Sequence, residues 1–342
     1  MTQQDELASS PWSGRIDAAD GERGRRWHQV VRPEAAADRP GVALLGFASD
    51  AGVTRNHGRP GAAEGPQALR RALANLAWHG GDGARLYDAG DVPCAGDQLE
   101  EAQSAYAARL AGLLRTGHFP LGLGGGHEIA WAAYQGIERA LADDPRLERL
   151  GIVNFDAHLD LRRPDSAGRG TSGTPFLQIA EARAARGLEF RYLCLGTSDA
   201  ANTPALFDRA RALGTTVITD LDAALPEVQR QLHRFIEASS AVYLTFCLDV
   251  LPPAVAPGVS APAGLGVALH RAVALLRDAL AACGHGQPGS KLLVADIAEL
   301  NPRFDSDGRT ARTAARLGYE LAAIHRITAD GAGILRDAPP PA

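Results

Sequence analysis

The stretch that decides the fold is VYLTFCLDVLPPAVAPG, residues 242–258. Up to Thr245 nearly every residue is branched or aromatic, which is typical of a buried strand, and the second half is a proline-rich loop. Cys247 and Asp249 lie where the strand gives way to the loop, and residues two apart on a strand share a face. The stretch therefore predicts a strand end that presents a thiol and a carboxylate side by side.

Similar apolar runs recur along the chain and alternate with segments of helical periodicity. Because the runs are nearly continuous, they indicate a parallel sheet that is covered on both faces. We therefore predict an α/β fold with a single doubly wound, mainly parallel sheet and helices on both faces. The expected strands are 41–48, 117–125, 149–160, 190–198, 215–220, 241–249 and 291–300, and the main expected helices are 64–78, 129–141, 226–238, 268–282 and 309–327.

The chain of 342 residues is long enough for one large α/β domain, and no repeat or Gly/Ser linker divides it. Residues 1–40 are rich in Asp, Arg, Gly and Pro with little periodicity, which predicts an N-terminal tail or arm. The α/β domain is expected to span residues 41–330. Residues 331–342 are expected to form a C-terminal tail.

Composition excludes several classes of function. The net charge of −5 gives no reason to expect a nucleic-acid or anionic-membrane partner. No apolar run approaches the ~20 residues that span a bilayer, and the first residues, MTQQDELASSPWSGR, lack an apolar signal core. The four cysteines lie far apart without paired spacing, as thiols in a reducing compartment do. We therefore expect a cytoplasmic protein that acts on a small molecule.

Polar residues gather at the ends of the predicted strands, where ligands bind in open α/β sheets. Asp156, His158 and Asp160 share one face if the strand continues through them, and together they suit Mn²⁺ or a similar ion. The alternative is a loop in which Asp156 caps a turn and His158 is an ordinary polar residue. A glycine run before His127 allows close approach of a ligand to the backbone, but no Lys-Ser/Thr follows it, so a phosphate loop is a poor fit.

Four motifs in this order resemble the ureohydrolases, the family of arginase, agmatinase and formimidoylglutamase. They are GGGHE (124–128), NFDAHLD (154–160), TFCLDVLPP (245–253) and DIAELNP (296–302), and the resemblance spans about residues 40 to 327. It implies the arginase-like three-layer α/β/α fold.

Three further segments are most similar to the formimidoylglutamase branch of that family. They are residues 49–66, 172–176 and 255–267. The resemblance to this branch implies hydrolysis of N-formimidoyl-L-glutamate to L-glutamate and formamide, a step of histidine degradation, with two Mn²⁺ per subunit. It also implies a homo-oligomer, a trimer or a hexamer.

The resemblance also implies a role for each metal ligand. His127 and Asp160 are expected at the first metal, His158 and Asp249 at the second, and Asp156 between them. The family carries a second bridging aspartate where this chain has Cys247. Sulfur is a soft ligand that binds metal only as the thiolate and favours Zn²⁺ or Cu⁺ over Mn²⁺.

The Cys247 departure leaves three outcomes open. The thiol ionises and a two-metal site survives with altered metal preference; or one metal position is weak or empty; or the protein binds a ligand without turnover. We favour the second. A fourth interpretation, in which Cys247 faces away as a small buried hydrophobe, is disfavoured by its spacing from Asp249.

The remaining expected site residues concern catalysis and the substrate. Asp160 is expected to relay a proton to the leaving nitrogen, and Glu299 stands where the family places a carboxylate against the cationic substrate nitrogens. Ser172 stands where arginase-like members carry a proton-shuttling His, which disfavours arginase and agmatinase. Because the expected substrate carries two carboxylates, arginine forks are required. The candidates are Arg55 and Arg59, with Asn56 between them, and Arg162.

Two alternatives to a formimidoylglutamase-like hydrolase remain open from the sequence. One is a ureohydrolase that acts on a guanidino acid, which keeps the chemistry and changes only the pocket. The other is a non-catalytic binding or regulatory protein on the same fold, for which Cys247 is the reason.

Overall fold

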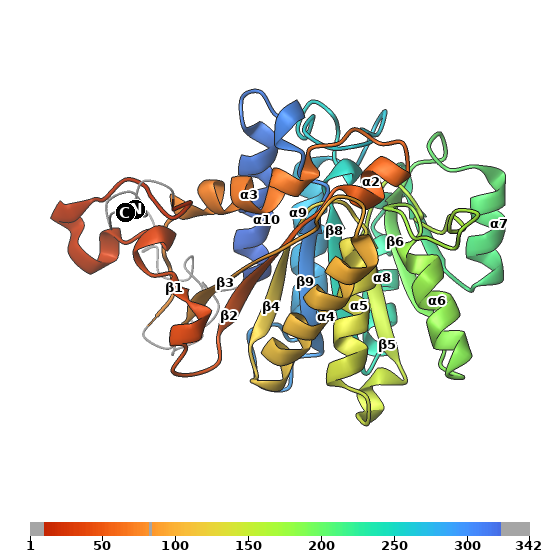
Figure 1. Ribbon diagram of the computed structural model, residues 1–342, viewed down its shortest axis with the longest axis horizontal. Helices are drawn as coiled ribbons and strands as arrows, with labels where there is room; N and C mark the ends of the chain where they lie inside the picture. The colour runs from red at the N-terminus through yellow and green to blue at the C-terminus, as the bar shows by residue number, and fades with distance from the viewer. Residues whose placement is uncertain (1–9, 82–83, 323–342) are drawn as a thin grey trace, which may run out of the picture.

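The computed structural model describes residues 10–81 and 84–322, and its centre is one nine-stranded sheet (Figure 1). Every neighbouring pair of strands is parallel, in the order β1-β3-β2-β4-β9-β8-β5-β6-β7. The predicted tail 331–342 lies outside the described residues. The strands are β1 Arg32–Pro33, β2 Val42–Ala48, β3 Leu86–Pro93, β4 Phe119–Gly124, β5 Leu150–Phe155, β6 Arg191–Thr197, β7 Thr216–Thr219, β8 Ala241–Cys247 and β9 Leu292–Ala298.

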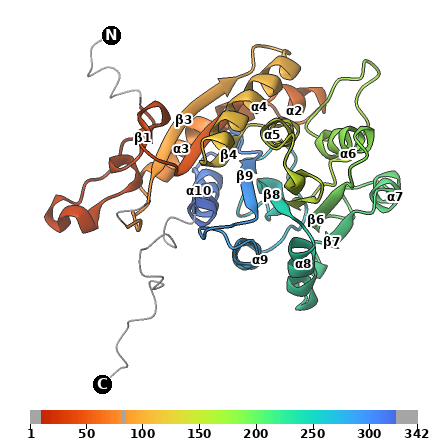
Figure 2. The same ribbon diagram turned by 90° about the horizontal axis from the view of Figure 1, so that it is seen from below.

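Helices cover both faces of the sheet, which confirms the predicted three-layer α/β/α architecture (Figure 2). No helix in the described ranges combines the length and the apolarity that crossing a bilayer requires. One face carries α3 Gly65–Ala74, α8 Glu227–Glu237, α9 Leu269–Ala282 and α10 Arg309–Ala322; the other carries α4 Leu99–Arg115, α5 Ile129–Ala140, α6 Pro175–Ala185 and α7 Pro204–Ala212.

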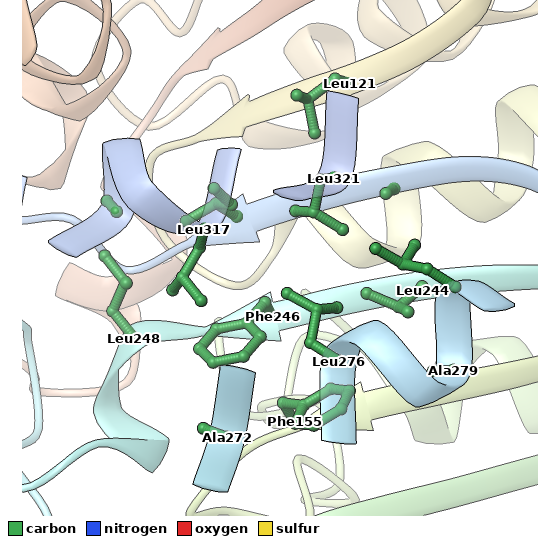
Figure 3. Close-up of a cluster of buried hydrophobic side chains, with 14 of the residues drawn as sticks. Leu121, Phe155, Leu244, Phe246, Leu248, Ala272, Leu276, Ala279, Leu317 and Leu321 are labelled. Carbon is green, nitrogen blue, oxygen red and sulfur yellow. The ribbon is translucent and has the colours of Figure 1, made fainter. Parts of the chain in front are cut away.

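Strand β8 shows how the sheet divides apolar from polar residues. Leu244 and Phe246 point to the face covered by α9 and α10, where they pack with Leu276 and Leu317 (Figure 3). The ring of Phe246 stacks on Phe155 of β5 at 5.1 Å. Burial of each of these side chains contributes about 1.5–3 kcal/mol to folding. The alternate residues of β8 therefore point to the opposite face of the sheet.

Two predicted strands end earlier than expected. The predicted strand 149–160 ends as β5 at Phe155, and the predicted strand 241–249 ends as β8 at Cys247, followed by a 3-10 helix, η7 Leu248–Val250. Strand alternation therefore does not align Asp156 with Asp160, nor Cys247 with Asp249. Loop geometry brings these side chains together instead, as described below.

The prediction missed some elements altogether. Strand β3 and helix α4 were not expected, and residues 10–40, expected as a tail or arm, contain β1 and three short 3-10 helices. β1 pairs with β3, and Trp27 of this segment is fully buried. The segment is therefore attached to the edge of the sheet and to the α3 side of the molecule (Figure 2).

The strand order places the site. β4 and β5 follow one another along the chain, but β9 and β8 lie between them in the sheet. Such a switch point leaves a crevice at the carboxyl ends of the strands, where ligands bind in this class of fold.

Candidate metal centre

Four neighbouring strands, β4, β9, β8 and β5, end together at this crevice. A cavity of about 240 Å³ opens there. Each strand end contributes at least one side chain with metal-binding or acid–base chemistry. The expected site residues that line the cavity are His127 after β4, His158 and Asp160 after β5, Cys247 and Asp249 at the end of β8, and Glu299 after β9.

The first candidate ligand group consists of His127, Asp156 and Cys247, whose ligand atoms lie within 4.8 Å of one another. His127 Nδ1 lies 2.8 Å from Asp156 Oδ2 and 3.0 Å from Asp160 Oδ2. This nitrogen is buried and has no hydrogen bond of acceptable geometry within the described residues. A buried imidazole nitrogen that lies this close to two carboxylate oxygens is a suitable place for a cation.

The second candidate group consists of Asp156, His158 and Asp249, again within 4.8 Å. His158 Nδ1 lies 3.1 Å from Asp249 Oδ2 and 3.6 Å from Asp156 Oδ1. The backbone N–H of His158 and the side-chain amide of Asn154 both donate to the Asp156 carboxylate and fix its orientation. Asp156 therefore belongs to both candidate ligand groups, with Oδ2 near His127 and Oδ1 near His158.

The protonation of the site reflects an excess of carboxylates. Burial disfavours the imidazolium of His127, but Asp156 and Asp160 outweigh burial and raise its pKa well above the usual value. For His158, burial is likewise outweighed by Asp249 and Asp156, and its pKa is raised. Burial and the charge of Asp156 raise the pKa of Asp160 to about 6. The carboxylates therefore favour protonated histidines at this site, and imidazole nitrogens beside carboxylate oxygens are a donor set that fits divalent cations.

The backbone around the cavity is strained. His57, Asp160 and Glu299 are the non-glycine residues with positive φ in the described part of the chain, at 60°, 47° and 72°. All three line the cavity. A left-handed conformation costs an L-residue about 1–2 kcal/mol, and such strain gathers at functional sites.

Cys247 belongs to the first ligand group rather than to an apolar cluster. Its side chain is 1% exposed and lines the cavity. Burial, followed by the charges of Asp156, Asp249 and Glu299, raises the pKa of the thiol well above its usual value. Without a metal the sulfur is therefore a neutral thiol that faces its carboxylate neighbours.

Glu299 is placed to meet a cation. Its Oε1 accepts a hydrogen bond of 2.8 Å from the backbone N–H of His127, while its buried Oε2 has no partner among the described residues. Burial and the charge of Asp249 raise its pKa to about 7. A planar substrate cation at the free oxygen would lower that pKa and compensate for the buried charge.

Four of the residues expected to bind substrate line the cavity. Asn56 donates from Nδ2 to Ser172 Oγ at 3.2 Å, so these two lie side by side. The guanidinium of Arg162 makes no hydrogen bond or ion pair with any other described residue. That of Arg59 is already held by the carbonyls of Pro257 and Val259 and stacks 3.9 Å above the ring of Phe304.

Arg55 is a correction to the expected site. Its guanidinium is bound by Asp97, Glu100 and the Gly170 carbonyl, at distances of 2.6 to 3.1 Å, and it does not line the cavity. It has no free donor face for a substrate carboxylate. Instead it ties the loop that bears Asn56 to helix α4.

Three polar lining residues were not among the expected site residues: His57, Asn202 and Ser260. Asn202 follows β6, and its side-chain amide bonds the backbone of Ala157 and Leu159 within the ligand loop. Because Asn202 is a polar residue that follows a strand end, the sequence could have identified it as a candidate site residue. Nothing local in the sequence distinguishes Ser260 from other loop serines.

Residues 40–323 match the family model described as the arginase family. The chain is 51% identical over 337 residues to the formimidoylglutamase of Aromatoleum aromaticum, covering 94% of each chain. It is 53% identical over 312 residues to that of Ralstonia nicotianae, covering 90% of this chain and 92% of the relative.

Solved structures give the same picture. The formiminoglutamase of Trypanosoma cruzi with Mn²⁺ superposes with a TM-score of 0.72 at 27% identity, covering 84% of this chain and 95% of that one. The proclavaminate amidino hydrolase of Streptomyces clavuligerus superposes with a TM-score of 0.70 at 27% identity, covering 87% and 96%.

Proposed function

Because the chain belongs to the arginase family, we propose that it is a binuclear metallohydrolase that converts N-formimidoyl-L-glutamate to L-glutamate and formamide. Relatives named formimidoylglutamase at about half identity over most of the chain support this substrate. The observation that carries the proposal is the pair of ligand groups that share the buried Asp156 beside the cavity lined by His127, His158 and Asp249. In the reaction, water adds to the formimidoyl carbon and the bond from that carbon to the glutamate nitrogen breaks.

The metal ligands divide between two positions. His127 and Asp160 would hold the first ion and His158 and Asp249 the second, with Asp156 common to both ligand groups and Cys247 a member of the first. When bound, two Mn²⁺ ions would supply Lewis acidity and the means to ionise water at neutral pH.

The protein groups orient the substrate and move a proton. Glu299 presents its unpartnered oxygen to the cationic amidine and aligns its planar carbon. Asp160 lines the cavity and lies 3.0 Å from His127 Nδ1, so it is placed to accept a proton and to pass it to the leaving glutamate nitrogen. This transfer makes the departing group a neutral amine.

The cavity also offers receptors for the substrate's two carboxylates. Arg162 has an uncommitted guanidinium at the cavity, and the Asn56–Ser172 pair presents neutral hydrogen-bond groups beside it. We assign one carboxylate to Arg162. Arg59, whose fork is partly used by backbone carbonyls, is the weaker receptor for the other.

Cys247 sets the metal preference of this site. A thiol has to lose its proton to bind, against a pKa that burial and three carboxylates have raised. We therefore propose that the metal positions next to Cys247 bind Mn²⁺ weakly and bind softer ions, Zn²⁺ among them, comparatively well. Activity would then require a high Mn²⁺ concentration.

A guanidino acid is the second candidate substrate class. The structural similarity to a Streptomyces clavuligerus amidino hydrolase favours it, because the same cation-binding glutamate would serve a guanidinium. The two substrate classes would differ in the lining residues that receive the rest of the molecule.

The decisive experiment incubates the protein with Mn²⁺ and N-formimidoyl-L-glutamate and measures glutamate release, with bound metal counted by mass spectrometry. Asp156→Asn should lose at least ~10³-fold in kcat, since it removes the shared ligand. Asp208→Asn, an exposed aspartate of α7, is the matched control. Two bound metals with release only from a guanidino acid would shift the assignment to the second class. Two bound metals without any release would indicate a binding protein.

A further inference from the structure

A line of polar residues runs from the metal centre into the middle of the sheet. Tyr243, Thr245 and Cys247 alternate along β8 on the same face, and Asp296 of β9 lies directly opposite Thr245 in the strand register. The side chains of Tyr243, Thr245 and Asp296 are all 0% exposed. An ionisable carboxylate in the centre of a sheet costs several kcal/mol unless its oxygens are bonded.

Hydrogen bonds connect this line to a ligand of the first metal. Tyr243 donates its hydroxyl proton to Asp296 Oδ2 and Thr245 donates its own to Asp296 Oδ1, both at 2.5 Å. His127 Nε2 lies 3.1 Å from Thr245 Oγ1. The hydroxyl of Thr245 has only one proton, and that proton is already given to Asp296. The bond to His127 can therefore form only if His127 Nε2 carries a hydrogen and donates it.

The backbone makes room for this arrangement. Gly122 of β4 is the register partner of Asp296 on the other side of β9. A Cβ atom at Gly122 would lie 2.6 Å from Asp296 Cβ and 2.7 Å from the Tyr106 hydroxyl. Asp296 thus sits in a space that only a glycine on the neighbouring strand leaves open.

We propose that Thr245 and Asp296 are positioning residues for the metal ligand His127, a role that rests on the proposed binuclear site. The chain Asp296–Thr245–His127 fixes the hydrogen on Nε2, so the lone pair of Nδ1 faces Asp156 and Asp160. It also stops the ring from flipping, and the Asp296 carboxylate makes the ring a stronger donor to a cation. Tyr243 holds the far oxygen of Asp296 and completes the chain.

The test is a Mn²⁺ titration followed by the EPR signal of free Mn²⁺, which needs no turnover. Thr245→Val removes the hydroxyl without changing side-chain volume and should weaken one Mn²⁺ equivalent by about 10–100-fold. Thr245→Ser keeps the hydroxyl and should remain within about threefold of the parent. Thr197→Val, at an equally buried threonine of β6, is the matched control and should bind both ions normally.

Single-site backgrounds separate positioning from a merely structural effect. The loss caused by Thr245→Val should persist in the His158→Asn background and vanish in the His127→Asn background, because only the first metal depends on His127. Asp296→Asn, which keeps the shape of the side chain, should reproduce part of the loss with the same dependence on His127. An equal loss of Mn²⁺ affinity in both backgrounds would overturn this inference and leave the proposed function standing. The same holds if the parent binds two Mn²⁺ ions and Thr245→Val leaves both affinities unchanged. A parent that binds no Mn²⁺ would overturn the proposed function, and this inference with it.

Discussion

Two buried clusters of charge in this molecule follow opposite rules. Under the strands β2 and β3, Arg70 of α3 is 1% exposed and its guanidinium is shared by Asp88, Asp91 and the Gly90 carbonyl. The indole of Trp12 donates to Asp88 as well. Each charge in this cluster has an opposite charge or a hydrogen bond within reach.

At the carboxyl ends of the central strands, the acidic side chains outnumber the groups that could balance their charge. Three aspartates and a glutamate face two histidines and a neutral thiol, and two of the buried polar atoms, His127 Nδ1 and Glu299 Oε2, lack partners in the described part of the chain. The pKa values of Asp160 and Glu299 are raised. The charges of the Arg70 cluster are therefore balanced without a ligand, and this cluster stabilises the fold. The charges of the cluster at the strand ends are balanced only with added cations.

The largest effect should come from breaking the complete cluster. Arg70→Met leaves Asp88 and Asp91 without their cation, at 20% and 19% side-chain exposure, and should cost about 3 kcal/mol of unfolding free energy. Urea denaturation measures this. Arg211→Met, which breaks an exposed pair with Asp208, is the control and should change stability by less than about 0.5 kcal/mol. Equal small losses for both would mean that the Arg70 cluster is not a structural ion pair.

Breaking the incomplete cluster should have the opposite sign. The folded-state pKa of Glu299 is about 7 against 4.5 for a free glutamate, so protonation favours the fold. That stability is fully present below about pH 4.5 and is lost as the pH rises through about 7. Gln does not ionise, so Glu299→Gln should not lose stability over this pH range. The unfolding free energy of the metal-free variant should exceed that of the parent by about 1–3 kcal/mol near pH 8 and equal it near pH 4.5. Denaturant titrations at both pH values measure the difference.

Glu320 is the matched control for that prediction. It is also fully buried, but its partners Arg277 and Arg316 outweigh burial and lower its pKa. Its contribution is present above the unfolded pKa and fades as the pH falls. Glu320→Gln should therefore destabilise the protein near pH 8. A loss of stability in both variants would show that the Glu299 carboxylate is satisfied without a cation.

The same contrast explains what the sequence predicts well. The ligand residues follow strands that are continuous apolar runs, so the run and the polar cluster at its end are both visible locally. The precise alignment was wrong, because Asp160 and Asp249 reach the site through a left-handed residue and a 3-10 helix rather than through strand alternation. Neither device has a local sequence signal as clear as alternation.

The paired cluster was the harder part to predict. Strand β3 contains Asp88, Gly90 and Asp91, which interrupt its apolar pattern, and the charges of both aspartates are paired by Arg70 of another element. The predicted role of Arg55 in substrate binding was wrong for the same reason, since its ion-pair partners Asp97 and Glu100 lie more than forty residues away in the sequence. A charged residue's partner depends on tertiary structure, so the sequence alone assigns such residues poorly.

The smallest expected effect tests how far the second cluster departs from its family. Cys247→Asp replaces a neutral thiol by a carboxylate in the first ligand group, and should raise Mn²⁺ affinity about tenfold, or about 1.4 kcal/mol. The preference for Zn²⁺ over Mn²⁺ should fall at the same time, because hard oxygen replaces soft sulfur. Calorimetric titration with each metal measures both changes, and Cys247→Ser, which removes sulfur without adding charge, separates them. Unchanged Mn²⁺ affinity in Cys247→Asp would show that residue 247 does not touch the metals, and the incompleteness of the cluster would then lie with its aspartates alone.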